Sequence, residues 1–363
     1  MSFEQHIKNK NLMLGNRIKD RKKIYLDTKF WVDFCDIALK KKNNENIKNV
    51  YDICKKLVNE KKAIFPISYR IFIELIKQTD KESLLQTVEI IDTLSQGVTI
   101  ISEDERVDLE ILYFLRSHIQ KSDLYEPTEL VWTKISNIMG VLSPELPLLS
   151  YEENIDVKIR FFDHIWDMSL YKMISTMGMD GIKRFPKSDG FADILNRGKF
   201  EHLEQNNTIH KTYMSEIDGI LDINESRINN SLKYLKEENK SSTTNMDEIL
   251  KTSKPLIERI YDLFNKQESE LFLASWDIMA KVHTTIRWDK KRKYRDNDSH
   301  DIGHIVTALP YFDYFFTEKS FASLITQIKY DQKYNCHVAW KYDEVLEIVN
   351  VIYKNNKDKN DAE

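Results

Sequence analysis

The stretch KIYLDTKFWVDFCDIAL, residues 23–39, decides the expected fold. Its first residues form a short apolar run that ends in an acid, Asp27. The residues that follow carry apolar side chains at helical spacing, and Thr28 stands where a helix cap is favoured. The stretch therefore predicts a buried strand, a turn and a helix, which together begin an α/β sheet.

The same alternation of strand and helix patterns recurs on both sides of a long middle region. AIFPI (63–67) and GVTIIS (97–102) predict two further strands, and DYFFT (313–317) and CHVAW (336–340) predict two more near the C-terminus. Helical patterns separate them. Because strands separated by helices form parallel sheets with right-handed connections, we expect an α/β fold whose sheet is assembled from both ends of the chain and flanked by helices.

The middle of the chain carries mostly helical patterns. We therefore expect a basic N-terminal extension at 1–22, a core in two parts at 23–103 and 287–363, and a large helical insertion or accessory domain at 104–286. An insertion of this size offers a surface for a regulatory protein partner.

Composition limits the possible classes of protein. The chain has 363 residues, of which 41% are hydrophobic and 31% are charged, so it can build a sizeable core. A net charge of −4 excludes a protein coated in basic residues, so any nucleic-acid contact must come from local patches. Its three cysteines are widely spaced, and no apolar window approaches a membrane span or a secretory signal. We expect a soluble, cytoplasmic protein without membrane contact.

Four acids from distant parts of the chain are expected at one edge of the sheet. Asp27 ends the first strand, Glu74 lies in the apolar helix after the second, Asp301 begins the helix before the fourth, and Glu318 follows that strand. In open α/β sheets the active site lies beyond the carboxyl ends of the strands. Oxygen-rich clusters bind Mg²⁺ or Mn²⁺, and such an ion can activate water for attack on a phosphodiester. The hypothesis is a metal-dependent nuclease, although each acid alone also fits a helix cap or a solvated loop.

Five polar neighbours are expected to support these acids without carrying the chemistry: Thr28, Asp298, His304, Thr317 and Lys319.

This arrangement resembles the PIN-domain nuclease family. The resemblance rests on YLDTKFWVD, SYRIFIELI and DIGHIVTALPYFDYFFTEK, and it covers about 23–103 and 296–353. It implies a parallel α/β sheet and cleavage of RNA at internal positions with Mg²⁺ or Mn²⁺.

Carried over position by position, the resemblance assigns the first three acids of the family to Asp27, Glu74 and Asp301. The fourth position, usually Asp, falls on Glu318, a longer carboxylate that can still reach a metal through water. The long insertion departs further from the family pattern and leaves substrate and regulation open. By analogy, a large accessory region on a small nuclease core suits a regulated defence or toxin effector.

The motif HDIGH (300–304) supports two other interpretations. It resembles HD-domain metal-dependent phosphohydrolases, in which His300 and Asp301 would bind metal, and His283 and Asp331 would be candidates for the missing ligands. That family is all-helical, whereas a strand pattern follows here. The two histidines of the motif also have the i, i+4 spacing of a zinc helix. We favour Asp301 as the metal-side residue, with His304 in a supporting role and His300 exposed.

A basic segment, RWDKKRKYR (287–295), leads into this motif. Its cations could bind phosphates while Trp288 and Tyr294 stack on unpaired bases, and a solvated loop is the alternative. RNA is favoured over DNA only because the resembling family acts mostly on RNA. A further alternative is an inactive nucleic-acid-binding or interaction module on a PIN-like fold. The expected nucleic-acid contacts are Lys290, Lys291, Arg292, Lys293, Tyr294 and Arg295.

Overall fold

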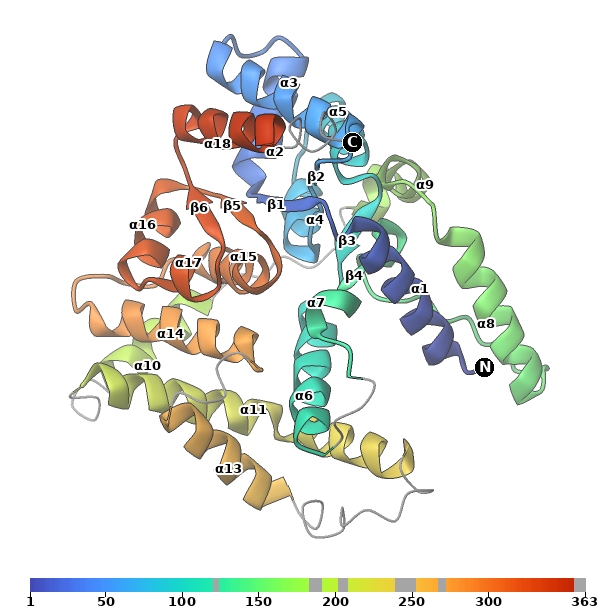
Figure 1. Ribbon diagram of the computed structural model, residues 1–363, viewed down its shortest axis with the longest axis vertical. Coiled ribbons are helices and arrows are strands. Elements are labelled where there is room, and N and C mark those ends of the chain that lie inside the picture. Colours follow the sequence, from blue (N-terminus) through green and yellow to red (C-terminus); the bar gives the residue numbers. More distant parts are fainter. Residues whose placement is uncertain (120–123, 183–190, 202–207, 239–252, 267–271, 356–363) are drawn as a thin grey trace. The chain divides into compact units, whose positions relative to one another are not determined.

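The structure is a computed structural model of the chain (Figure 1). It describes residues 1–119, 124–182, 191–201, 208–238, 253–266 and 272–355. The chain divides into two compact units. Unit 1 contains residues 1–102, 128–186 and 307–363, and unit 2 contains residues 103–127 and 187–306.

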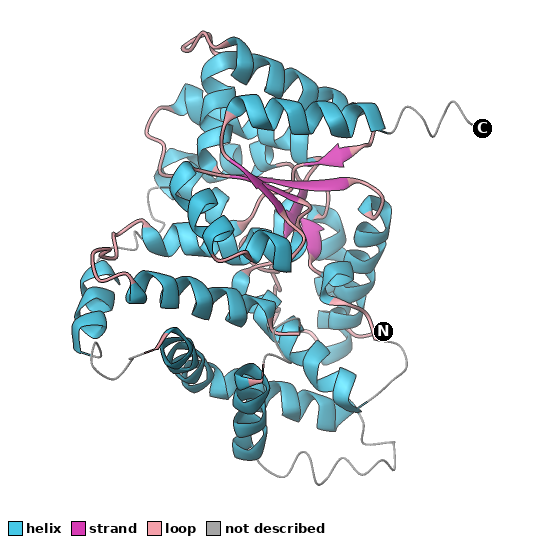
Figure 2. Cartoon of the chain, turned by 60° about the vertical axis from the view of Figure 1, so that its left-hand side comes forward, coloured by secondary structure: helices cyan, strands magenta, loops and turns pink. Residues whose placement is uncertain are grey.

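Unit 1 contains a parallel sheet of four strands in the order β2-β1-β5-β6. The strands are β1 (Lys22–Leu26), β2 (Ala63–Ile64), β5 (Tyr314–Phe316) and β6 (His337–Ala339). β1 pairs in parallel with both β2 and β5, and β5 pairs in parallel with β6. Figure 2 shows helices on both sides of these strands. The expected α/β class, with a parallel sheet drawn from both ends of the chain, is confirmed.

The centre of this sheet is apolar on both faces. Ile24, Tyr25 and Leu26 of β1 are each at most 1% exposed. The ring of Tyr25 packs edge-to-face on Phe312 and Phe315, with centroids 5.0 and 5.4 Å apart. Strands of a parallel sheet are buried on both faces, which is why the sequence shows continuous apolar runs here instead of an alternating pattern.

The helices of unit 1 mostly follow or precede the strands in the chain. They are α1 (Phe3–Ile18), α2 (Thr28–Ala38), α3 (Glu45–Asn59), α4 (Tyr69–Leu75), α5 (Lys81–Ser95), α8 (Tyr151–Ile165), α9 (Leu170–Ile182), α16 (Lys319–Gln327), α17 (Tyr330–Lys333) and α18 (Tyr342–Asn355). α18 packs on α3, and α2 packs on α3 and α5. The short α7 (Pro127–Leu130) and α15 (Asp298–Tyr311) each cross the division between the units.

The third expected strand, at 97–102, lies outside the four-stranded sheet. β3 (Val98–Ile100) pairs antiparallel with β4 (Trp132–Lys134), a strand that the sequence did not predict. A parallel bridge between Ile67 and Thr99 joins β3 to the chain that follows β2. The strand itself was predicted correctly, but its main partner comes from the region expected to be mainly helical.

The division into units differs from the expected domain boundaries. Residues 128–186 are grouped with unit 1, because β4 pairs with β3 and α9 packs on α5. The carboxylate of Asp92 on α5 accepts the N–H groups of Leu170 and Tyr171 at 2.8 and 2.9 Å, which ties the start of α9 to α5. Residues 287–306, which were expected in the core, are grouped with unit 2.

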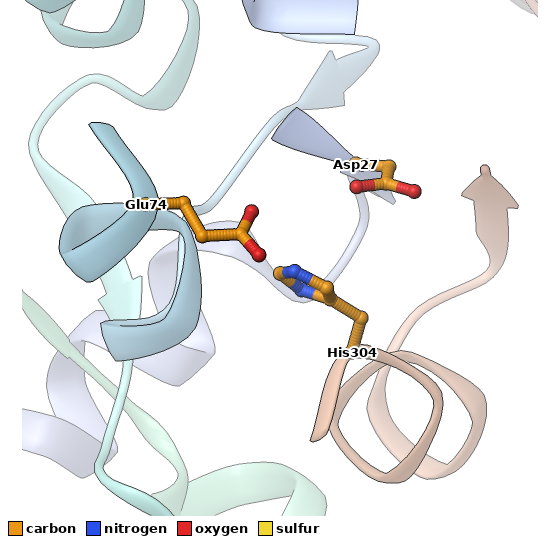
Figure 3. Close-up of side chains that lie close together, drawn as sticks. All are labelled: Asp27, Glu74 and His304. Atoms are coloured by element: carbon orange, nitrogen blue, oxygen red, sulfur yellow. The ribbon is translucent and has the colours of Figure 1, made fainter. Parts of the chain in front are cut away.

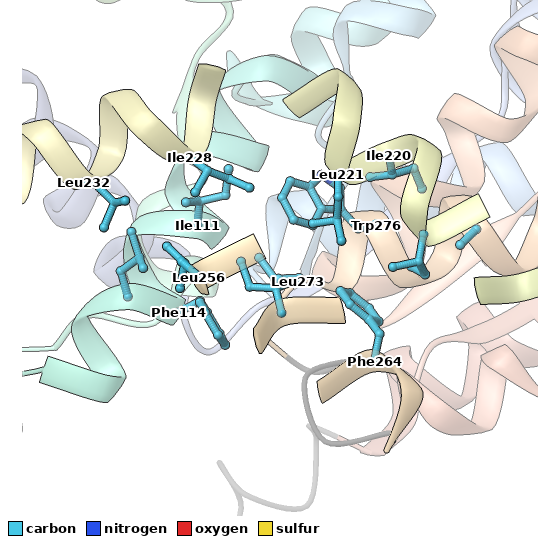
Figure 4. Packing of buried hydrophobic residues seen from close by; sticks show 14 of the residues in the cluster. Ile111, Phe114, Ile220, Leu221, Ile228, Leu232, Leu256, Phe264, Leu273 and Trp276 are labelled. Atoms are coloured by element: carbon cyan, nitrogen blue, oxygen red, sulfur yellow. The ribbon is translucent and has the colours of Figure 1, made fainter. Parts of the chain in front are cut away.

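Unit 2 is a helical assembly of α6 (Glu103–Ile119), α10 (Phe191–Glu201), α11 (Ile209–Glu238), α13 (Ser253–Asn265) and α14 (Ala274–Trp288), joined by the start of α15. Apolar side chains of α6, α11, α13 and α14 meet in one buried cluster, including Phe114, Ile228, Phe264 and Trp276 (Figure 4). Among the helices that the structure describes, none combines the length and hydrophobicity needed to cross a bilayer.

A close backbone approach on α1 gives a test of this packing. A Cβ added at Gly15 would lie 2.4 Å from the carbonyl oxygen of Glu129, whereas one added at Gly219 on α11 would have no neighbour within 4 Å. Gly15→Ala should therefore destabilise the protein by about 1–3 kcal/mol. Gly219→Ala should stabilise it by about 0.5–1 kcal/mol, because alanine is the better helix former. Thermal unfolding of both variants measures the difference, and equal melting temperatures would contradict the close approach.

Candidate metal site at the carboxyl edge of the sheet

The strands β1, β5 and β6 end in register at one edge of the sheet, here called the carboxyl edge. Leu26, Phe316 and Ala339 are paired across the three strands. One residue further on, the Asp27 N–H donates to the Phe316 carbonyl at 2.9 Å and the Thr317 N–H donates to the Ala339 carbonyl at 3.0 Å. The hydrogen-bond ladder therefore continues into the residues that carry functional side chains.

Asp27 lies at the point where the strand order reverses. β2 lies beside β1 on one side, and β5 and β6 lie on the other side. In open α/β sheets the binding crevice forms at this reversal. The Asp27 side chain is only 7% exposed, and its Oδ2 accepts a 2.8 Å hydrogen bond from the Thr317 hydroxyl. Its Oδ1 has no hydrogen-bond partner among the described residues, so one carboxylate oxygen is fixed and the other is available to a ligand.

Glu74 reaches the same edge from α4. The helix begins after Ser68, whose Oγ accepts the Ile71 N–H and lies 2.7 Å from the Tyr25 hydroxyl, so the start of α4 is held against β1. The Thr28 hydroxyl donates to Glu74 Oε2. Thr28 was expected to cap α2, but Asp27 occupies the N-cap position and Thr28 is the first helical residue. Its hydroxyl is therefore available to orient Glu74.

Asp27 and Glu74 of unit 1 and His304 of unit 2 are candidate ligands for a metal ion (Figure 3). A carboxylate oxygen of Asp27 lies within 4.8 Å of a carboxylate oxygen of Glu74. Asp27 and Glu74 both belong to unit 1, whereas His304 lies on the residues of α15 that are grouped with unit 2. The two carboxylates are thus the part of the group that one unit supplies by itself.

The other two expected acids are not members of this group. Asp301 lies one helical turn before His304 on α15, and it is not among the candidate ligands in the described chain. Glu318 is exposed at the N-cap of α16, where its side chain makes no cap hydrogen bond. The sequence signal for His304 was its apolar setting within IGHIV, where a polar side chain needs a partner.

The donor set fits a divalent cation. Carboxylate oxygens suit Mg²⁺ and Mn²⁺, and an added imidazole nitrogen favours a transition metal such as Mn²⁺ over Mg²⁺. Hydrogen bonds from Thr28 and Thr317 hold the two carboxylates in place, as outer partners of metal ligands do.

The start of α15 differs from expectation in two residues. His300 was expected to be exposed, but its side chain is only 6% exposed because it lies within the packed first turns of the helix. Asp298 was expected to support the acids. It contacts the basic segment instead: Oδ2 accepts the Arg295 N–H at 3.1 Å, and Oδ1 lies 3.9 Å from Arg292 Nη2.

The basic segment is held in shape by α10. The buried Lys199 donates from Nζ to the carbonyl oxygens of Ile286, Asp289 and Arg292, the first two at 2.8 and 2.6 Å. Asn196 exchanges two hydrogen bonds with the backbone of Tyr294, at 2.8 and 2.9 Å. The segment is therefore an ordered loop. Its exposed cations are Lys290, Lys291, Lys293 and Arg295, and Arg292 is half-buried.

Tyr294 does not have the exposed ring that base stacking requires. It is 3% exposed, and its hydroxyl lies 2.9 Å from His283 Nδ1. Desolvation, followed by the nearby Arg287 charge, lowers the pKa of His283 to about 4. Trp288, by contrast, is 45% exposed and remains available.

The half-buried His283, whose pKa is lowered, predicts a loss of stability in acid. The pKa of His283 in the folded protein is about 4, below the ordinary value of 6.5. The unfolded chain therefore binds a proton first as the pH falls. The contribution of neutral His283 to the free energy of unfolding is complete above pH 6.5 and is lost as the pH falls toward 4. The loss should approach about 3 kcal/mol. Thermal unfolding at pH 7.5 and 4.5 should show a smaller drop in melting temperature for His283→Gln than for the wild type. His210→Gln, an exposed position in unit 2, is the control and should match the wild type.

The geometry of the candidate metal site is the basis for assigning its role, because comparisons with known proteins identify no relative. No family model, no curated protein and no solved structure matches the chain.

Proposed function

We propose that the protein is a divalent-metal-dependent endonuclease with a PIN-like core, acting on RNA in preference to DNA. The observation that carries the proposal is the placement of Asp27 at the reversal point of a parallel sheet, bonded to Thr317 and beside Glu74. A buried carboxylate beside a half-buried one is costly to maintain unless the two bind a positive partner.

The residues of the carboxyl edge have distinct roles in this proposal. Asp27 and Glu74 would hold Mg²⁺ or Mn²⁺, and His304 is the third candidate ligand. A divalent cation bound there would activate a water molecule and offset the charge that develops on the attacked phosphate. Thr317 and Thr28 orient the carboxylates. Glu318, exposed at the N-cap of α16, would orient a water through its carboxylate.

The substrate assignment rests on charge and on the family resemblance. Lys290, Lys291, Lys293 and Arg295 expose their cations on an ordered loop, which is suited to bind phosphates. The charge of these side chains does not distinguish RNA from DNA. The preference for RNA therefore comes from the PIN-like resemblance alone. A defence or toxin role, regulated through unit 2, is the biological setting that this combination would suit.

Replacement of the central acid should abolish cleavage. Asp27→Asn removes a ligand charge while keeping the shape of the side chain, so Mn²⁺- or Mg²⁺-dependent cleavage of labelled single-stranded RNA should fall by at least about 100-fold. Asp313→Asn is the matched control. Its carboxylate precedes β5 at the opposite end of the sheet and accepts the Lys23 N–H at 2.8 Å.

Three outcomes of this assay are informative. Retained cleavage by Asp27→Asn would overturn the assignment. Loss in His300→Gln with retention in Asp27→Asn would favour the HD-type phosphohydrolase. Absence of metal-dependent cleavage in the wild type would favour a binding module without activity.

Metal affinity gives a test that is independent of turnover. Thr317→Val removes the hydroxyl that holds Asp27 Oδ2 while keeping the branched shape, and Thr317→Ser retains the hydroxyl. Mn²⁺ binding measured by calorimetry should weaken about 10- to 100-fold in the valine variant and change little in the serine variant. Equal affinities in the two variants would show that this hydrogen bond does not position a metal ligand.

A further inference from the structure

Three lysines at the carboxyl edge of unit 1 face aromatic rings. Lys319 Nζ and Lys341 Nζ lie 5.2 and 5.0 Å from the ring centroid of Trp340. Lys29 Nζ lies 5.9 Å from the ring of Tyr342. Trp340 is thus flanked by two cations directly after the edge strand β6.

The strand register places Trp340 in line with the candidate metal site. Asp27, Thr317 and Trp340 each follow one of the paired residues Leu26, Phe316 and Ala339. Trp340 therefore lies two strand spacings, about 10 Å, from Asp27 along the edge of the sheet. Asp27 and Trp340 therefore follow strands that end at the same edge of the sheet.

The three lysines carry charge that the described chain does not neutralise. Lys29, Lys319 and Lys341 are exposed, and none of them forms an ion pair with a described residue. The nearby Lys42, by contrast, pairs with Asp33 at 2.5 Å. An anionic ligand could therefore recruit these lysines without breaking a salt bridge.

Tyr342 and Trp340 differ in what they offer a ligand. The Tyr342 hydroxyl donates to Asp33, and its ring packs on Phe30 with centroids 5.0 Å apart, so Tyr342 is tied into the structure. Trp340 is half-buried, and its ring faces the two lysine side chains in the described chain. The lysine side chains are flexible and can move from the ring to a phosphate when a base takes their place.

We propose that Trp340, Lys319, Lys341 and Lys29 form a binding surface for single-stranded nucleic acid, with one base stacked on Trp340 and the adjoining phosphates held by the lysines. The partner is single-stranded because a base exposes its flat face to an indole only when it is unpaired. The inference deepens the proposed function by naming its substrate class, and it rests on that function for the direction in which the strand would lead, toward Asp27.

Binding without turnover tests this surface. The affinity of the full-length protein for a fluorescent single-stranded RNA is measured by anisotropy in chelator, which prevents metal-dependent cleavage. Trp340→Ala should weaken binding about 10-fold, since one stacked base contributes on the order of 1–3 kcal/mol. Trp340→Phe, which keeps a flat ring, should retain most of the affinity. Tyr151→Ala, at an 80% exposed aromatic on α8, is the control and should bind like the wild type.

The salt dependence of binding tests the lysines separately. Lys319→Ala with Lys341→Ala should reduce the slope of log affinity against log salt concentration by about one for each phosphate that the protein no longer neutralises. The same measurement with single-stranded DNA shows whether binding depends on the sugar. The affinity for a duplex of the same sequence should be unchanged by Trp340→Ala. An equal reduction on the duplex, or unchanged affinity of Trp340→Ala for single strands with a native melting temperature, would overturn the proposal.

The two proposals fail in different ways. A wild type that binds single strands through Trp340 but never cleaves them would refute the nuclease and leave the surface standing. Cleavage that requires Asp27 while Trp340→Ala binds normally would refute the surface and leave the nuclease standing.

Discussion

The pairing of β1 with β5 is the constraint on which the rest of unit 1 depends. It places the central strand of the sheet beside a strand from the other end of the chain, and the Thr317 hydroxyl reaches Asp27 Oδ2 across 290 residues of sequence. The same pairing creates the reversal of strand order at which Asp27 lies. Without it, β6 and the residues after it would have no sheet to join, and the carboxyl edge would consist of Asp27 and Glu74 alone.

Much of this edge could be predicted from the sequence, because its signals are local. An apolar run followed by an acid and a helical pattern identifies both β1 and Asp27, and an acid inside IFIELI identifies Glu74. The choice between Asp301 and His304 could not be made in the same way. The two residues are one turn apart on α15, and which of them is a candidate ligand depends on the rotation of that helix, which no local pattern fixes. The antiparallel partner of β3 was missed for a related reason, since β4 lies in a region of mostly helical patterns and its pairing depends on contacts distant in sequence.

The basic segment shows how tertiary contacts change the meaning of a charge pattern. Its composition predicted a binding loop with two stacking aromatics, but only partners distant in sequence reveal that Tyr294 is buried and Trp288 is not. Lys199, on α10, is a buried cation whose three hydrogen bonds go to carbonyl oxygens, so it serves the loop backbone and not a carboxylate. A carbonyl cluster of this kind can satisfy a buried ammonium group without an opposite charge.

The division of the sheet between the two ends of the chain also has a consequence for synthesis. β1 ends at residue 26, whereas β5 begins at residue 314. At roughly 5–20 residues per second, the ribosome needs about 15 to 60 s to make the intervening chain. During that time the central strand has one edge without its final partner, and the Asp27 carboxylate has no Thr317 hydroxyl to hold it. The complete carboxyl edge can therefore exist only once residues 314–340 have emerged, so a nascent chain that ends before them lacks it.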